Sequence, residues 1–100
     1  MHRATIKSLS ADLAARKLSS VELTQHFLKR INVLGKKYNC FITLDPEASL
    51  KQAQAADRMR AEGRGGPLTG IPVAQKDIFC AKGWLTTCGS KILSNFKSPY

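Results

Sequence analysis

The stretch SSVELTQHFLKRINVLG, residues 19–35, carries the strongest structural signal in the chain. Ser19 and Glu22 form a capping-box pattern, in which the serine hydroxyl accepts a backbone N–H and the glutamate reaches back to the cap. Apolar side chains then recur at helical spacing, which places them on one face of a helix. They are Leu23, Phe27, Ile31 and Leu34. Gly35 is a natural stop for this helix, so the pattern predicts an amphipathic helix over residues 20–35.

Two further helices are indicated on either side. Asp45 can cap a helix, and Pro46 suits its first position, which predicts a helix over residues 46–62. Its apolar side consists of small residues, which permit close approach to a neighbour. Before the central helix, Ser8 and Ser10 are candidate caps for a short helix over residues 10–16.

Two short segments are predicted to be strands. Cys40–Leu44 is rich in strand formers, and residues 68–74 form an apolar run that Gly70 and Pro72 interrupt. Proline cannot donate to a strand ladder, so the second strand lies at an edge, begins late or is irregular there. Together the elements predict an α/β fold in which both strands belong to one sheet and the helices over residues 20–35 and 46–62 cover it, as one edge of a larger mixed sheet in the whole protein.

Length, charge and cysteine content limit the function classes. The chain has 100 residues, enough for one small domain, and a net charge of +9. Its basic residues come in scattered pairs with no interleaved aromatics, which does not favour direct nucleic-acid binding by this segment. The three cysteines are widely spaced and odd in number, which is typical of free thiols in a reducing cytosol. The N-terminus does not resemble a secretory signal, and no apolar run is long enough to span a membrane.

Lys76 is the residue that the local sequence singles out for chemistry. It lies between the apolar pairs Val73-Ala74 and Ile78-Phe79. A lysine in such surroundings either extends its ammonium group to water or is buried for a functional reason. His26 lies on the predicted helix over residues 20–35 and is interpreted as a surface imidazole. Residues 63–67 are glycine-rich but lack the sequence context of a phosphate-binding loop.

At Lys76 the chain resembles the amidase signature family. The segment PLTGIPVAQKD, residues 67–77, is similar to the lysine-bearing segment of that family. The segment TTCGSKILSNF, residues 86–96, together with SPY at residues 98–100, resembles one member class, the A subunits of aspartyl/glutamyl-tRNA amidotransferases. The resemblance covers essentially the whole chain. It implies that residues 1–100 are the N-terminal fragment of a single larger amidase domain.

Two departures from the family pattern stand out. The family commonly has asparagine after its Lys-Asp pair, where this chain has Ile78. The glycine- and serine-rich signature that carries the nucleophilic and bridging serines does not occur in these residues. The resemblance therefore assigns one member of a Ser-Ser-Lys catalytic set, Lys76, to this chain, and the fragment alone is expected to be inactive.

The resemblance also implies a mechanism. A bridging serine takes the proton of the nucleophilic serine and passes it to Lys76, whose amine must therefore be neutral. Apolar neighbours such as Ile71, Val73 and Ile78 would favour the neutral amine by excluding water. The Asp77 carboxylate would oppose this if it faced Lys76, so we expect it to turn toward backbone donors instead.

The implied function is hydrolysis of glutamine in the cytoplasm to release ammonia for transamidation of misacylated Glu-tRNA(Gln) or Asp-tRNA(Asn). The implied partners are subunits B and C in a heterotrimer, and ATP and magnesium are used by the complex rather than by this chain. Two alternatives remain: a stand-alone amidase of small amides, and a basic module that binds RNA or protein. In isolation the chain is expected to expose apolar surface, including Leu23, Phe27 and Trp84.

Overall fold

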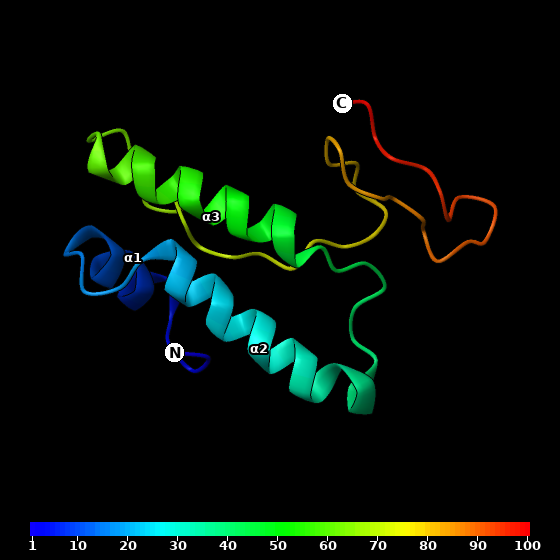
Figure 1. The fold of residues 1–100 in the computed structure, drawn as a ribbon, viewed down its shortest axis with the longest axis horizontal. Coiled ribbons are helices and arrows are strands. Elements are labelled where there is room, and N and C mark those ends of the chain that lie inside the picture. The colour runs from blue at the N-terminus through cyan, green and yellow to red at the C-terminus, as the bar shows by residue number, and fades with distance from the viewer. The chain divides into compact units, whose positions relative to one another are not determined.

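The computed structural model describes residues 1–100, and all of its regular structure is helical (Figure 1). The helices are α1 (Ile6–Ala14), α2 (Ser20–Tyr38) and α3 (Pro46–Ala61). The chain divides into two compact units. Unit 1 contains Met1–Asn39 and Asp45–Pro72, and unit 2 contains Cys40–Leu44 and Val73–Tyr100. None of the helices combines the length and the apolar character that crossing a membrane requires.

Helix α2 begins where the sequence predicts and ends later. The Ser19 hydroxyl accepts the N–H of Glu22 at 3.0 Å, and the Glu22 carboxylate accepts the N–H of Ser19 at 3.3 Å. The helix continues past Gly35 to Tyr38, and Asn39 follows in a left-handed conformation with φ of 50°. Asparagine tolerates this conformation, so it can end the helix in the role that was predicted for Gly35. The predicted end at Gly35 is wrong.

The outer helices differ in how well they were predicted. The Asp45 carboxylate accepts the N–H of Ala48 at 3.0 Å and Pro46 is the first helical residue, which confirms the predicted start of α3. Helix α1 begins earlier than predicted, because Thr5 caps it by accepting the N–H of Ser8 at 3.1 Å. The helix then ends at Ala14, before the predicted limit at residue 16.

The core of unit 1 joins α1 to α2. Leu9 and Leu13 of α1 are buried against Leu23 of α2, which is fully buried. Around this cluster lie three partly buried apolar side chains, those of Leu18, Phe27 and Ile71. The expectation that Leu23 would stay exposed in the isolated chain is therefore wrong, because α1 covers it.

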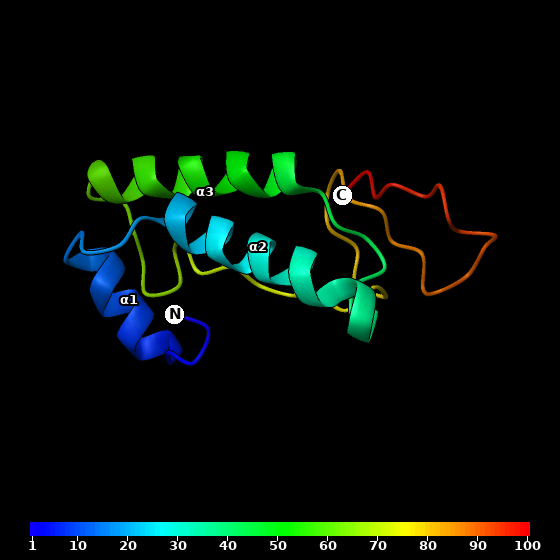
Figure 2. The same cartoon turned by 60° about the horizontal axis from the view of Figure 1, so that its bottom comes forward.

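Helices α2 and α3 lie side by side and run in opposite directions (Figures 1 and 2). Small residues lie at and beside this contact. Ala53 is buried on α3, and an added Cβ at Gly70 would lie 3.0 Å from Cβ of Ser20 and 3.7 Å from Cβ of Ala56. The apolar side predicted for this helix, Ala48, Ala55, Ala56 and Met59, is only partly correct, because Ala55 is exposed and the buried residue is Ala53.

Neither predicted strand forms. Cys40–Leu44 and residues 68–74 contain no strand, and the sheet of the expected α/β fold is not confirmed. In residues 66–70 side chains bond every backbone carbonyl except that of Leu68, which accepts the N–H of Ile71. Ser10 donates to Pro67 at 2.6 Å, Ser20 to Gly70 at 2.9 Å, and Arg60 to Thr69 at 2.9 Å and to Gly66 at 3.2 Å. These carbonyls are satisfied without a ladder, and Gly70 turns the chain with φ of 86°.

Unit 2 consists of turns held by hydrogen bonds. Its only pairings are isolated bridges between Lys82 and Ser98 and between Leu85 and Lys97. Its buried residues are all polar: Thr86, Thr87 and Ser98. Large apolar side chains remain exposed, including Val73, Ile78, Phe79 and Ile92. The unit therefore has no apolar core of its own.

Candidate functional site around Lys76

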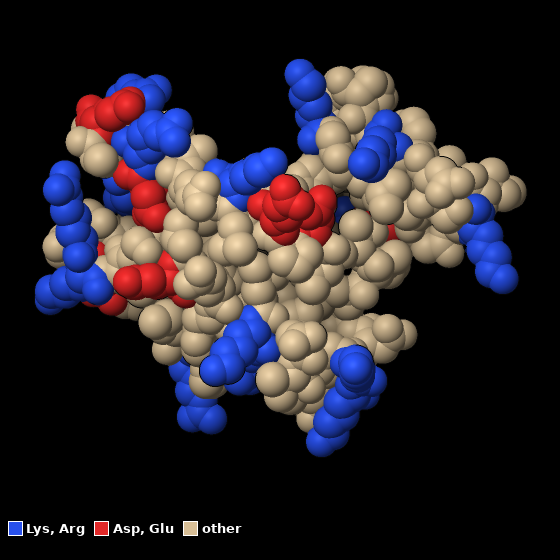
Figure 3. All heavy atoms as spheres, in the orientation of Figure 1, with Lys and Arg blue, Asp and Glu red and all other residues tan.

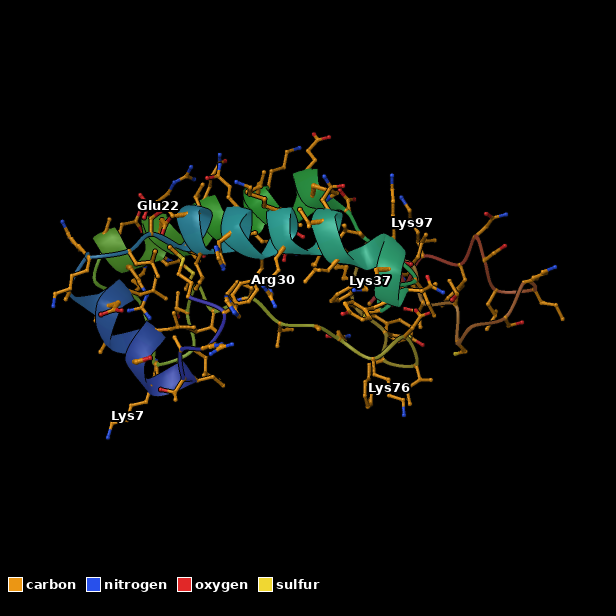
Figure 4. The ribbon with its side chains drawn as sticks, turned by 90° about the horizontal axis from the view of Figure 1, so that it is seen from below. Lys7, Glu22, Arg30, Lys37, Lys76 and Lys97 are labelled. Atoms are coloured by element: carbon orange, nitrogen blue, oxygen red, sulfur yellow. The ribbon has the colours of Figure 1, made fainter.

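Lys76 begins a tight turn in unit 2. Its carbonyl accepts the N–H of Phe79 at 3.1 Å, and the side-chain amide of Gln75 donates to the carbonyl of Phe79 at 3.2 Å. The Lys76 side chain is exposed and projects away from the ribbon (Figure 4). Its ammonium group forms no ion pair, since both ion pairs of the chain lie elsewhere, between Lys51 and Glu47 and between Arg64 and Glu62.

The apolar cover expected around Lys76 does not form from these residues. Val73 is 82% exposed and Ile78 is 52% exposed. The third expected neighbour, Ile71, belongs to unit 1, where it packs against the helical core. Within residues 1–100 these side chains therefore do not exclude water from the lysine.

The Asp77 carboxylate turns toward Thr87. One oxygen accepts the backbone N–H of Thr87 at 2.9 Å, and the other accepts the Thr87 hydroxyl. The predicted bond from Asp77 to a backbone donor is confirmed. The hydroxyl and then the N–H of Thr87 hold the pKa of Asp77 below its ordinary value, because both favour the ionised form.

Two adjacent threonines connect the lysine turn to the C-terminal part of unit 2. Thr86 is buried, its N–H donates to the carbonyl of Phe96 at 3.0 Å, and its hydroxyl lies 3.5 Å from the carbonyl of Phe79. Thr87 binds Asp77 and also accepts the N–H of Gly89 at 3.2 Å. The role of Thr87 was not predicted. Its sequence signal is only a hydroxyl residue in a small polar run, ten positions beyond Asp77.

A second group of ionisable side chains lies in unit 1. The rings of His2 and His26 are stacked with centroids 6.0 Å apart, and Nε2 of His26 is buried without a hydrogen-bond partner. His26 is partly buried, so its interpretation as a surface imidazole is wrong. The positive charge of Arg30 is the main cause that lowers the pKa of the exposed His2, and a small desolvation adds to it. No set of three or more His, Cys, Asp or Glu side chains is placed to bind a metal.

The basic side chains do not form a single block on the face that Figure 3 shows. Lys and Arg side chains project in separate groups, with Asp and Glu side chains among some of them. This distribution agrees with the scattered basic pairs of the sequence.

Comparison with known proteins assigns the chain to a family. The amidase family model matches residues 22–100, which include α3, most of α2 and the whole of the Lys76 turn. The chain belongs to the amidase family. It is 69% identical over all 100 residues to the A subunit of glutamyl-tRNA(Gln) amidotransferase from Nitrosospira multiformis. It is 62% identical over all 100 residues to the protein of the same name from Nitrosomonas europaea.

This amidase-family chain matches only part of those relatives. It covers 21% of the length of each, so it spans about a fifth of the curated relatives it matches. A third protein of that name, from Methylobacillus flagellatus, is 60% identical over 96 residues, which are 96% of this chain and 20% of that relative. Lys76, Asp77 and Thr87 all lie within the range of the amidase match.

Proposed function

We propose that this chain is the N-terminal part of an amidase that hydrolyses glutamine and supplies ammonia to convert misacylated Glu-tRNA(Gln) or Asp-tRNA(Asn). The observation that carries the proposal is the 69% identity, over all 100 residues, to the A subunit of a glutamyl-tRNA(Gln) amidotransferase. That identity favours the amidotransferase over a stand-alone amidase of small amides. The family match over residues 22–100 favours an enzyme over a basic binding module.

In this proposal Lys76 is the terminal proton acceptor of the amidase reaction. A serine hydroxyl must lose its proton to attack the amide carbonyl of glutamine. A bridging serine accepts that proton and transfers its own to Nζ of Lys76, and both serines lie outside residues 1–100. A base must come within about 3 Å of the proton that it accepts. The exposed, unpaired Lys76 side chain is free to make that approach from its turn.

The proposal extends to the complete protein. Residues 1–100 form part of one larger amidase domain with a mixed sheet flanked by helices, and the missing part covers Lys76. The complete protein works in the cytoplasm with subunits B and C, and the complex uses ATP and magnesium on misacylated tRNA. The exposed apolar side chains of unit 2 support this arrangement, because such surface is normally covered in a finished fold.

The test compares variants of the complete protein, which is longer than residues 1–100, within the assembled complex. Lys76→Ala is expected to lower the turnover of glutamine by about 10²–10⁴-fold, the usual contribution of a general base. Lys76→Arg is expected to fail as well, since a guanidinium stays protonated and cannot accept a proton. Lys82→Ala is the matched control, because Lys82 is exposed in the same unit, and it should remain near wild type.

A second measurement separates ammonia production from ammonia use. With ammonium chloride in place of glutamine, Lys76→Ala should still support amidation of Glu-tRNA(Gln), because the partner needs only the ammonia. Near-normal glutamine turnover in Lys76→Arg would contradict the base role. Loss of the circular dichroism signal in Lys76→Ala would show that the lysine is structural. Glutamine turnover without any tRNA amidation would indicate a stand-alone amidase.

A further inference from the structure

Three hydrogen bonds from Thr87 and Cys88 hold Asp77 in place. Its carboxylate accepts the N–H of Thr87 at 2.9 Å and the hydroxyl of the same residue. Its backbone carbonyl accepts the N–H of Cys88 at 3.0 Å. Thr87 is buried, and its hydroxyl oxygen also accepts the N–H of Gly89 at 3.2 Å. The Asp77–Thr87 clamp, as we call these bonds, therefore joins a buried segment to the turn that carries the lysine.

The clamp restricts the position of the Lys76 backbone, from which the lysine side chain projects. Consecutive Cα atoms are about 3.8 Å apart across a trans peptide, so fixing the backbone and side chain of Asp77 restricts the backbone of Lys76. The hydrogen bond from the N–H of Phe79 to the carbonyl of Lys76, at 3.1 Å, closes the turn on the other side. The lysine backbone is thus restrained at two points, while its amine remains free.

The clamp also directs a negative charge away from the lysine. Adjacent lysine and aspartate side chains can pair, and a pair would favour the charged ammonium over the neutral amine. Here both carboxylate oxygens are used by Thr87, and Lys76 forms no ion pair. A proton acceptor benefits from this arrangement, because it must be neutral before it acts.

We propose that Asp77, through its bonds to Thr87, is a positioning residue for Lys76 in the amidase reaction. This inference rests on the proposed role of Lys76 as the terminal base. Neither Asp77 nor Thr87 touches the substrate in this account. They place the lysine backbone and keep the adjacent carboxylate occupied.

The experiment measures kcat and KM for glutamine in the assembled complex. Thr87→Val removes the hydroxyl and keeps the shape and the backbone N–H. Asp77→Ala removes both side-chain bonds. Each is expected to lower kcat by about 10–100-fold, the scale of a misplacement of about 1 Å, with the larger loss in Asp77→Ala. KM for glutamine should change by less than about threefold, because the lost interaction acts on the chemical step. Thr87→Ser keeps the hydroxyl and should restore most of kcat.

Asp45→Ala is the control for a purely structural carboxylate. Asp45 also accepts a backbone N–H, that of Ala48 at 3.0 Å, and it lies at the start of α3. Its loss should lower the melting temperature and leave kcat unchanged. Amidation of Glu-tRNA(Gln) with ammonium chloride should survive in the Asp77 and Thr87 variants, because the partner subunit is not altered.

The outcomes separate the two proposals. If Lys76→Ala abolishes glutamine hydrolysis while Asp77→Ala and Thr87→Val retain normal kcat, the positioning role is wrong and the base role stands. If Lys76→Ala retains hydrolysis, the base role itself is wrong. If Thr87→Val loses hydrolysis and ammonium-dependent amidation together, with a lower melting temperature, the clamp is only structural. Recovery of kcat in Thr87→Ser, with ammonium-dependent amidation retained across the series, supports positioning.

Discussion

The carboxylate of Asp57 in α3 accepts the backbone N–H of Ser20, the first residue of α2, at 2.7 Å. The other carboxylate oxygen accepts the N–H of Val21 at 3.2 Å. The first N–H groups of a helix have no partner within the helix, and a negative charge is favourable there. Asp57 therefore caps α2 from a neighbouring helix, in addition to the local cap that Ser19 supplies.

Removal of this carboxylate should loosen the start of α2. We expect Asp57→Ala to cost about 1.5–3 kcal/mol, the usual range for hydrogen bonds to a charged group. Hydrogen–deuterium exchange of a peptide spanning residues 18–24 should then be faster. Glu47→Ala is the control on the same helix, because the Glu47–Lys51 pair is exposed and its loss should cost about 0.5 kcal/mol or less. Unchanged exchange in Asp57→Ala would contradict the capping role.

Gly70 is expected to tolerate no side chain. Its φ of 86° is costly for other residues, and an added Cβ would meet Cβ of Ser20 at 3.0 Å. We expect Gly70→Ala to lose about 1–2 kcal/mol from the left-handed backbone, plus a further loss from this contact. Gly63→Ala is the matched control, since Gly63 has φ of 74° with nothing within 4 Å. Urea denaturation of the complete chain should show a larger loss for Gly70→Ala, and equal losses would contradict the close approach.

The pKa of Asp77 gives a direct measurement of the clamp. The hydroxyl and the N–H of Thr87 hold this pKa below the ordinary 3.8. A lowered carboxyl pKa stabilises the folded state above pH 3.8, and the contribution is lost as the pH falls below 3.8 through the folded-state pKa. Thr87→Val should raise the pKa toward 3.8, as measured by NMR titration of ¹³C-labelled aspartate. Lys82→Ala should leave it unchanged, and an unchanged value in Thr87→Val would argue against the hydroxyl bond.

Residues 1–100 alone should not hydrolyse glutamine. Lys76 is present, but acyl transfer also needs a nucleophile and a group that stabilises the oxyanion. The measurement is ammonia release from glutamine by the purified chain, with its Lys76→Ala variant as the background. Release above that background would mean that these residues contain a complete site.

Residues 1–100 alone should also bind an apolar dye. Val73, Phe79 and Ile92 are 82%, 60% and 94% exposed, and unit 2 has no buried apolar residue to offset them. We expect strong fluorescence of an anilinonaphthalene dye, or self-association by light scattering. The complete chain is the control and should bind far less. A monodisperse monomer that melts cooperatively without binding dye would show that the fragment is an autonomous domain.

The candidate site was only partly predictable. Lys76 was identified from its segment and from the family resemblance, and the turn of Asp77 toward a backbone donor followed from the cost of facing the lysine. Thr87 was missed because nothing local distinguishes a threonine that binds a carboxylate ten residues earlier. The apolar cover expected around Lys76 in the enzyme does not form within residues 1–100, because Val73 and Ile78 are close to the lysine in sequence and yet are exposed.

The sequence by itself determined that the three helices form. The tertiary structure decided the backbone conformation and the hydrogen-bond partners of the segments between and after them. The caps at Ser19 and Asp45 bond to residues three positions away, so they can be recognised from local sequence. The strand prediction for residues 68–74 failed because distant side chains satisfy carbonyls in and beside it. Ser20 reaches Gly70 across 50 positions, and Ser10 reaches Pro67 across 57. Strand propensity reports only how a segment fits a sheet; whether its backbone bonds to a strand or to side chains depends on which groups the fold brings beside it.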